Sequence, residues 1–299
     1  MNMDLSQRRN IVVATDFSPA AQRAVERAAH LARAAGCGLC LLHVFNDALW
    51  HSLASVFSVE HWRGEKDPAL VAREALSQQA REIGQRFSLP VAAECLTGRP
   101  AAMLADYARE SGARLLVAGL RGESSLDEVL VGGTALKTLA RSTVPVYLAR
   151  TSTVGVPARI LVAVDDSQAA TSRLQQVGGL FPNARLTIFR SYEVPCEGRM
   201  RLAGASEGDI LSYRDAERAR TVRWLGEFIA GLPESLAERC TPRQVRGFPA
   251  PAILQEAEAM HADLVAVGRH GGRPGEERLL GSVTQNVLYH SRSDVLLLP

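Results

Sequence analysis

The stretch IVVATDFSPAAQRAVERAAHLARAAG, residues 11–36, decides the fold predicted for this chain. It starts with a short apolar run, which is typical of a strand buried on both faces. Ser18 then offers a side-chain cap for a helix, and Pro19 suits the first helical position. Alanine and leucine recur at helical spacing until Gly36, a residue type that commonly ends helices. A buried strand leading directly into an amphipathic helix is typical of an α/β protein.

The same signals return later in the chain, which indicates a tandem duplication. IVVATD (residues 11–16) recurs as ILVAVD (residues 160–165), an offset of 160 − 11 = 149. The second strands, LCLLHVF (residues 39–45) and LTIFRSY (residues 186–192), align at an offset of 147. The pairs that keep the offset of 149 are Gly98/Gly247, Pro100/Pro249, Gly119/Gly268, Gly122/Gly271, Gly132/Gly281 and Val146/Val295. We expect two domains of about 150 residues, 1–150 and 158–299, with a linker over residues 151–158.

Strand and helix signals alternate within each copy. In copy 1 the strands are predicted at residues 11–15, 39–45, 91–96, 114–118 and 145–149, with helices after residue 18 and at 67–87, 100–111 and 134–140. Copy 2 repeats the order, with a long helix around residues 209–230. Apolar strands separated by helices predict a parallel sheet covered on both sides. The predicted fold class is therefore α/β, with two tandem doubly wound domains of five parallel strands each.

Composition and charge argue against several classes of protein. Hydrophobic residues make up 46% of the chain, which is enough for two cores, and 34 Lys and Arg face 32 Asp and Glu. Such a balance argues against binding to nucleic acid or to an anionic membrane through overall net charge. No apolar run approaches the roughly 18 residues of a membrane span, and residues 1–10 lack the core of a signal peptide. The five scattered cysteines fit reduced thiols, so we expect a soluble, cytoplasmic protein.

A glycine-rich segment follows the predicted fourth strand of copy 2. It reads GRHGGRPGEERLLGS, residues 268–282, and spaces its glycines as G-x-x-G-x₉-G-S. Ligands of an open parallel sheet bind beyond the carboxyl ends of the strands, where the winding reverses. If the first and fourth strands are neighbours there, Asp165 and Gly268 meet at one site.

The residue types in this segment favour a nucleotide. Glycines allow positive φ angles and close approach of backbone N–H groups to a ligand. Gly281 and Ser282 precede a predicted helix, whose N-terminus favours phosphate, and the serine hydroxyl adds a donor. Asp165 accepts hydrogen bonds only, so it suits an amine or a ribose hydroxyl. We expect the nucleoside near the first strand and the phosphates near the last helix.

The pattern G-x-x-G-x₉-G-[ST], together with VATDFS or VAVDDS at the first strand, resembles the universal stress protein family. In copy 1 the segments TDFSPAAQRAVERAAHLA, LLHV and TGRPAAMLADYARESGARLLVAG carry the resemblance, which spans nearly the whole chain as a tandem member. The resemblance implies adenine nucleotide alpha hydrolase-like domains and, where the motif is intact, ATP at the glycine loop. Carried over to copy 2, the site comprises Ala163, Val164, Asp165, Ser191, Val267, Gly268, Gly271, Gly281, Ser282 and Val283. Ser191 departs from the family, which often has valine there.

Copy 1 carries a degenerate form of the motif. Its equivalent residues are Ala14, Thr15, Asp16, Val44, Gly119, Gly122, Gly132, Gly133 and Thr134. Gly133 replaces the hydroxyl residue of the motif, and the nine-residue stretch holds Glu123, Asp127 and Glu128 without a base. Three carboxylates oppose a triphosphate unless a divalent cation such as Mg²⁺ intervenes. In copy 2, Arg273 and Arg278 balance two glutamates, so we expect copy 2 to bind ATP and copy 1 to bind it weakly or not at all.

Other motifs carry weaker signals. There is no P-loop sequence, and no dinucleotide fingerprint follows the first strand. Cys37 and Cys40 lie where a helix ends rather than where one begins, so a structural role is expected. No metal site is expected, because His51 and His61 lack a third ligand. The remaining expectations concern His43 as structural, His270 as exposed although able to contact a phosphate, and the arginines at 199, 201, 214, 218, 220 and 223 as a solvated face.

The residues leave some alternatives open. Arg190 stands where copy 1 has His43, and it either reaches a ligand or pairs with an acid of its own domain. No general base or nucleophile is well placed, which favours a regulatory ATP-binding module acting in stress response. A slow ATPase or phosphotransferase using Asp165 or His270 with Mg²⁺ is one alternative. A scaffold that holds a non-nucleotide ligand is another.

The last predicted strand of each copy bears on assembly. Residues 145–149 and 295–298 are apolar and end their copies. In the family that the chain resembles, the last strand pairs across a two-fold axis. The resemblance therefore implies an intramolecular pseudo-dimer that hides both sheet edges, and it is compatible with a further homodimer.

Overall fold

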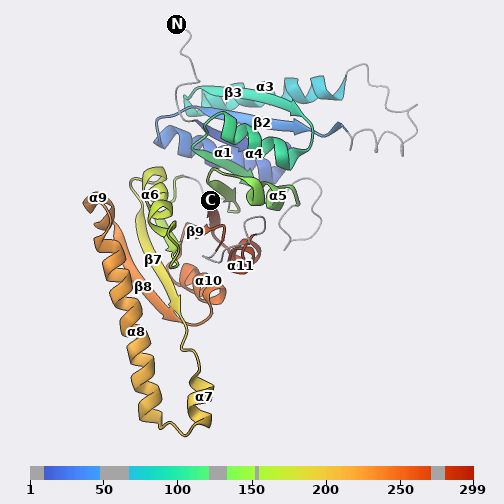
Figure 1. Cartoon of the computed structure of the whole chain (residues 1–299). Helices are drawn as coiled ribbons and strands as arrows, with labels where there is room; N and C mark the ends of the chain where they lie inside the picture. The colour runs from blue at the N-terminus through green and yellow to red at the C-terminus, as the bar shows by residue number, and fades with distance from the viewer. Residues whose placement is uncertain (1–9, 48–66, 121–132, 152–154, 271–279) are drawn as a thin grey trace. The chain divides into compact units, whose positions relative to one another are not determined.

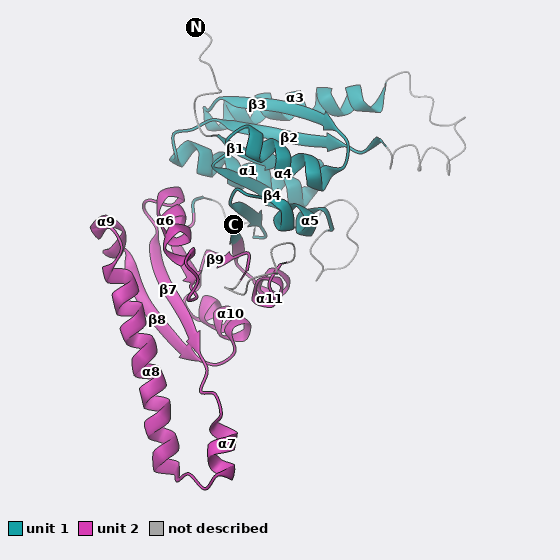
Figure 2. Cartoon of the chain, in the orientation of Figure 1, with its two compact units in different colours: residues 1–156, 296–299 teal, residues 157–295 magenta. Residues whose placement is uncertain are grey.

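The computed structural model describes residues 10–47, 67–120, 133–151, 155–270 and 280–299. The chain divides into two compact units (Figure 2). Unit 1 comprises residues 1–156 with 296–299, and unit 2 comprises residues 157–295. Each unit is built of strands and helices in alternation, so the predicted two-domain α/β architecture is confirmed. No helix in the described parts of the chain is both long and apolar enough to cross a bilayer.

Unit 1 is a parallel sheet wound in two directions (Figure 1). Its elements are β1 (Ile11–Ala14), α1 (Pro19–Ala34), β2 (Leu39–Phe45), α3 (Pro68–Phe87), β3 (Val91–Thr97), α4 (Pro100–Glu110), β4 (Leu115–Gly119), α5 (Gly133–Arg141) and β5 (Val146–Ala149). The strand order is β3-β2-β1-β4-β5, and the pairs are parallel. The winding therefore reverses between β1 and β4. Helix α1 lies beside α3 and α4 beside α5, as expected when each direction of winding covers its own face.

Unit 2 repeats this plan. Its elements are β6 (Arg159–Ala163), α6 (Ala170–Leu180), β7 (Arg185–Tyr192), α7 (Glu197–Leu202), α8 (Glu207–Ala230), α9 (Glu234–Ala237), β8 (Cys240–Arg246), α10 (Pro249–Ala259), β9 (Leu264–Gly268) and α11 (Ser282–His290). The last strand, β10 (Asp294–Leu298), begins in unit 2 and ends among the residues assigned to unit 1. The order β8-β7-β6-β9 matches β3-β2-β1-β4 of unit 1. Hydrophobic side chains of β6 and β9 are buried, as the apolar runs predict for central strands.

The backbone conformation explains why the glycine pair Gly98/Gly247 is repeated. Gly98 and Gly247 have φ angles of +145° and +146°, which L side chains rarely adopt. Their N–H groups donate to the carbonyl oxygens of Phe45 and Tyr192, each at 3.0 Å. Each glycine thus follows an edge strand and turns the chain toward the proline that opens the next helix. The pairs Gly98/Gly247 and Pro100/Pro249 repeat because both units make the same turn.

The first helix starts differently in the two units. In unit 1 the Ser18 hydroxyl accepts from the N–H of Ala21 at 3.2 Å, which confirms the predicted cap, and α1 begins at Pro19. In unit 2 the N-cap is Ala169, without a side-chain hydrogen bond, and α6 begins at Ala170. The repeat predicts a start at residue 168, so α6 begins two residues late. Glutamine at that position lacks the fixed φ that proline provides for a first helical residue.

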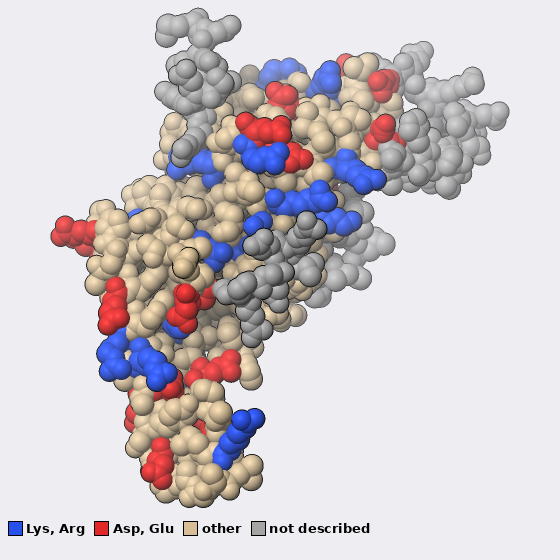
Figure 3. All heavy atoms as spheres, viewed as in Figure 1, with Lys and Arg blue, Asp and Glu red and all other residues tan. Residues whose placement is uncertain are grey.

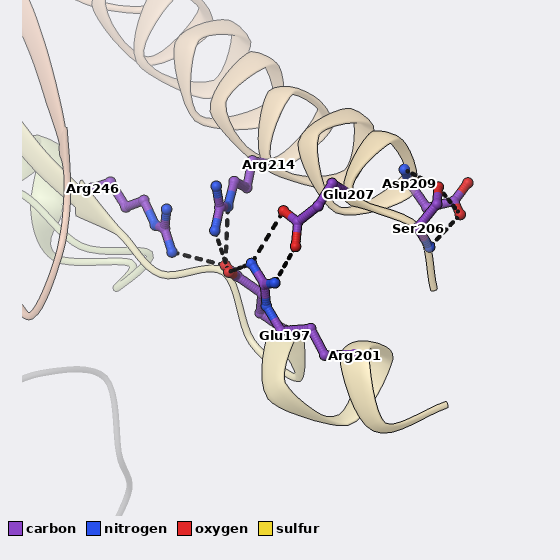
Figure 4. A network of polar contacts seen from close by, with 7 residues as sticks. All are labelled: Glu197, Arg201, Ser206, Glu207, Asp209, Arg214 and Arg246. Atoms are coloured by element: carbon purple, nitrogen blue, oxygen red, sulfur yellow. Dashed lines mark hydrogen bonds and ion pairs between the residues drawn. The ribbon is translucent and has the colours of Figure 1, made fainter. Parts of the chain in front are cut away.

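Helices α7 and α8 project past the ends of β7 and β8 (Figure 1). Ser206 and Asp209 form a capping box at the start of α8, with N–H bonds of 2.9 Å and 3.2 Å. The side chain of Glu197 accepts from Arg214, Arg201 and Arg246, the last at 2.8 Å (Figure 4). Acidic and basic side chains are interspersed over this part of the molecule (Figure 3). Arg201 and Arg214 are thus paired, as is Arg220 with Glu217, although the sequence analysis predicted a merely solvated face.

We predict that the contact between α7 and α8 weakens in acid. The hydrogen bond from Arg214, assisted by the other arginines, lowers the pKa of Glu197 from 4.5 to about 2. A carboxylate with a lowered pKa stabilises the fold fully above its unfolded pKa, and this contribution is lost as the pH falls toward the folded value. Amide exchange in α7, corrected for intrinsic rates, should accelerate between about pH 4.5 and pH 2.

The variant Glu197→Gln tests this assignment. It removes the charged partner shared by Arg214 and Arg246, while Arg201 keeps its pair with Glu207. We therefore expect faster exchange of α7 already at pH 6 and a smaller further change between pH 4.5 and pH 2 than in the wild type. The matched control is Glu258→Gln on α10, which removes the exposed ion-pair partner of Arg292. It should leave amide exchange in α7 unchanged. Wild-type protection of α7 that stays constant down to pH 2 would show that Glu197 does not hold the two helices together.

Candidate functional site

The first and fourth strands are neighbours in both units. β6 pairs with β9 through Leu161↔Val265 and Val162↔Ala266. β1 pairs with β4 in the same way, through Val13↔Val117. The expected adjacency at the reversal of winding is therefore confirmed. It brings the turn after β6 and the end of β9 to one edge of the sheet.

An aspartate shapes the turn at this edge in each unit. Asp165 Oδ1 accepts from the N–H of Ser167 at 3.0 Å, and Asp16 Oδ1 accepts from the N–H of Ser18 at 3.1 Å. Both carboxylates are half-buried. The bond orients each side chain and engages one of its two oxygens. Each aspartate thus has a structural task in its turn, whatever ligand it contacts.

The second strand adds one predicted residue in each unit. The register Ala163↔Phe189 continues with the N–H of Val164 donating to the Phe189 carbonyl at 3.0 Å. Ser191 lies two residues further along β7, which extends to Tyr192. The corresponding position in unit 1 is Val44, which is buried, whereas Ser191 is half-buried. Ala163 and Val164 of unit 2 are also half-buried, and in unit 1 Ala14 is half-buried and Thr15 buried.

The described positions of the two motifs do not need glycine for a positive φ. None of the described motif glycines has a positive φ, and Gly281 is extended at φ −61° and ψ 152°. Gly119 is instead a point of close approach, because an added Cβ would lie 2.9 Å from the carbonyl carbon and oxygen of Ala20. Val267, just before Gly268, is buried in β9. Gly122, Gly132 and Gly271 lie outside the described residues.

The start of α11 is tied to the end of β9. The buried hydroxyl of Thr284 donates to the Gly268 carbonyl at 2.7 Å, and the N–H of Gly281 donates to the Arg269 carbonyl at 3.0 Å. The Gly281 N–H is thus engaged by the chain itself. Ser282 is the first helical residue and is exposed, and Val283 is half-buried. Early helical N–H groups have no partner within their own helix, so this end of α11 can donate to an anion.

The described residues of unit 1 have no equivalent of the Thr284 bond. Helix α5 begins at Gly133, and both Gly133 and Thr134 are exposed. The residue aligned with Thr284 is Ala135, which has no hydroxyl to donate to the end of β4. The two copies therefore share the turn after the first strand and differ at the start of the last helix.

An arginine that the sequence analysis missed lies against Gly268. A Cβ added at Gly268 would lie 2.8 Å from Arg173 Cζ. Arg173 Nη1 donates long hydrogen bonds to Ser167 Oγ at 3.4 Å and to the His270 carbonyl at 3.5 Å. Burial lowers the pKa of Arg173, and the nearby Asp165 raises it. The repeat could have revealed Arg173, because the offset of 149 aligns this charged residue with Ala24 of copy 1.

The open alternative for Arg190 is resolved in favour of an acid of its own domain. Its guanidinium donates to both Asp166 oxygens, at 2.6 Å and 2.7 Å, and lies 4.1 Å from the ring centroid of Trp224. This bond lowers the pKa of Asp166. In unit 1 the aligned residues are Phe17 and His43, whose rings are 4.9 Å apart. An ion pair in unit 2 thus replaces a ring contact in unit 1.

The remaining predicted residues have mixed outcomes. His43 Nδ1 lies 2.8 Å from the Thr15 carbonyl, which fits the expected structural role. His270 is half-buried, so the expectation of an exposed side chain was wrong. Burial raises the pKa of Cys40 to about 11, and its sulfur lies 3.3 Å from the Tyr107 hydroxyl, which fits an unreactive thiol. His51 and His61 lie outside the described residues.

Comparison with known proteins agrees with the repeat and the fold. The universal stress protein YxiE of Bacillus subtilis (strain 168) is 33% identical over 148 residues, which cover 47% of this chain and 97% of that protein. A universal stress protein of Mycolicibacterium smegmatis (strain ATCC 700084 / mc(2)155) is 27% identical over 303 residues, covering 96% of both chains. A crystal structure of a universal stress protein from Archaeoglobus fulgidus DSM 4304 shares the fold, with a TM-score of 0.67, 21% identity and 98% of both chains covered.

The family match itself is present twice. The sequence pattern of the universal stress protein family matches residues 7–150 and again residues 158–299. These ranges follow the duplication seen at the offset of 149, and each contains one copy of the turn and strand arrangement described above. The chain therefore belongs to the universal stress protein family and carries two copies of the family's domain in tandem.

Proposed function

We propose that unit 2 binds ATP and that the chain acts as a regulatory module in stress response, with unit 1 binding ATP weakly or not at all. The observation that carries the proposal is the bond from Thr284 to the Gly268 carbonyl, 2.7 Å long. It holds the start of α11 against the end of β9, next to the turn that contains Asp165. A carboxylate for the nucleoside and helix N–H groups for phosphate then belong to one site.

The difference between the units supports a single strong site. Ser282 offers a hydroxyl at the first turn of α11, whereas Gly133 offers none at the first turn of α5. Hydrogen bonds to charged groups contribute about 1.5–3 kcal/mol, which corresponds to roughly tenfold to a hundredfold in affinity. A divalent cation such as Mg²⁺ would accompany the triphosphate, because phosphate charge favours its binding. Signalling then rests on nucleotide-dependent conformation or assembly rather than on turnover.

Calorimetric titration of the full chain with Mg²⁺ and ATP tests this proposal. We expect one ATP per chain, and a tenfold or greater loss of affinity in Ser282→Gly, which copies the residue found in unit 1. Gly133→Ser is the reciprocal variant and should strengthen any binding by unit 1. Two equal sites per chain, or no heat of binding at all, would contradict the proposal.

A further inference from the structure

Two positions that are apolar in unit 1 hold arginine in unit 2. The offset of 149 aligns Ala24 with Arg173 and Leu120 with Arg269. Ala24 and Leu120 are buried, at 0% and 5% exposure, so they belong to the core of unit 1. Arg173 and Arg269 are half-buried. Placing guanidinium groups in such positions is costly unless a partner offsets the loss of water, which suggests a role outside packing.

The late start of α6 gives Arg173 its place. In unit 1 the backbone of Ala20 and Ala21 in α1 covers Gly119 directly, at 2.9 Å and 3.2 Å from a Cβ added there. In unit 2, where α6 starts at Ala170, the atoms nearest to Gly268 are those of the Arg173 guanidinium. The first glycine of the motif is therefore covered by helix backbone in one unit and by a positive charge in the other.

The guanidinium lies between the two loops that form the candidate site. Its Nη1 reaches Ser167 in the turn after β6 and the His270 carbonyl in the loop after β9. Both bonds, at 3.4 Å and 3.5 Å, are long for N–H···O hydrogen bonds, and both acceptors are uncharged. An arginine carries five N–H donors in a planar fork that matches a phosphate group. Arg173 can therefore turn donors toward an anion in this crevice.

The charges around Arg173 also favour an anion. The acidic group acting on it is Asp165, and the positive charge of Arg269 acts in the opposite sense. The next acid along the turn, Asp166, is held by both guanidinium nitrogens of Arg190. Asp165 and Arg269 thus act on the Arg173 guanidinium with opposite signs, and Asp165 also serves its own turn. A phosphate would compensate the mutual repulsion of the two arginines.

We propose that Arg173 binds the phosphate nearest the ribose when unit 2 holds a nucleotide, an inference that rests on the proposed function. Arg173 lies beside Asp165, at the nucleoside end of the site, and over Gly268. Ser282 lies further along, at the start of α11. A monophosphate therefore already engages Arg173, and the outer phosphates of ATP engage Ser282. Unit 1 has no equivalent charge, because Ala24 occupies the position.

Titrations of the full chain with adenosine, AMP and ATP test the assignment. In Arg173→Met, the affinities for AMP and for ATP should both fall by a similar factor, about tenfold to a hundredfold, while the affinity for adenosine stays as in the wild type. Arg173→Lys keeps the positive charge but not the planar fork of donors. Its affinity for AMP and ATP should lie between those of the wild type and of Arg173→Met. Arg243→Met is the matched control, because it removes a cation of β8 that is paired with Glu256 on α10, away from the candidate site. We expect it to bind all three ligands like the wild type.

Pyrophosphate alone separates this inference from the proposed function. At constant ionic strength, pyrophosphate should slow amide exchange in β9 of the wild type, because it stabilises unit 2. This slowing should be lost in Arg173→Met. If neither protein binds adenine nucleotides but this difference persists, the proposed function fails and the anion site stands. Equal or tighter binding of AMP by Arg173→Met overturns the inference, as does a pyrophosphate effect that is absent from the wild type or equal in both proteins.

Discussion

Replacing Gly119 with alanine should destabilise unit 1 by about 1–3 kcal/mol, more than Gly268→Ala destabilises unit 2. At Gly119 the new Cβ lies 2.9 Å from backbone atoms of Ala20, in the first turn of α1. Backbone in a capped helix cannot give way unless α1 moves off the sheet. At Gly268 the new Cβ meets the far end of the Arg173 side chain, which can rotate aside.

Hydrogen exchange measures the two effects separately, because β4 reports on unit 1 and β9 on unit 2. We expect lower protection of β4 in Gly119→Ala and a loss below about 1 kcal/mol for β9 in Gly268→Ala. Gly226→Ala, in the middle of α8 where an added Cβ meets nothing within 4 Å, is the control and should stabilise slightly. Equal losses at the two motif glycines would show that α1 does not press on Gly119.

Replacing Thr284 with valine should cost unit 2 about 1–3 kcal/mol and also weaken ATP binding. Valine keeps the shape of threonine, but it cannot donate to the Gly268 carbonyl, which now receives a bond of 2.7 Å from a side chain that is 3% exposed. Without that bond, α11 is held less firmly against β9, and Ser282 at the start of α11 is positioned less firmly as well. Stability and affinity should therefore fall together.

Thermal unfolding and calorimetry on the same samples check this pair of effects. Thr284→Ser retains the hydroxyl and loses only a methyl group, so it should keep wild-type affinity at a small cost in stability. If Thr284→Val binds ATP as tightly as the wild type, the tether does not position the site. A loss of stability without a loss of affinity would have the same meaning.

Much of the fold could be predicted because its signals are local. The apolar run of β2 has the predicted bounds, and α3, which Asp67 caps, begins at Pro68, one residue after the predicted start. The repeat offset then carried the order of unit 1 over to unit 2. The late start of α6 was not predicted, because Ser167 aligns with the cap Ser18 but forms no cap bond. The short helices α7 and α9 were not among the predicted elements.

The site was less accessible to sequence reasoning. Asp165 and Gly268 could be placed together, because both follow strands that the winding makes neighbours. Arg173 was missed because a basic residue in an amphipathic helix normally faces solvent, and only its alignment with the buried Ala24 marks it as unusual. At Gly119 a close approach of helix backbone, rather than a positive φ, explains the glycine.

A crystal structure of the full chain grown with Mg²⁺ and ATP tests the central claim most directly. The account predicts density for one nucleotide, in unit 2, with the ribose beside Asp165, the first phosphate at Arg173 and the outer phosphates at the start of α11. A nucleotide held by unit 1 alone would contradict the account, as would ATP-grown crystals in which both units are empty.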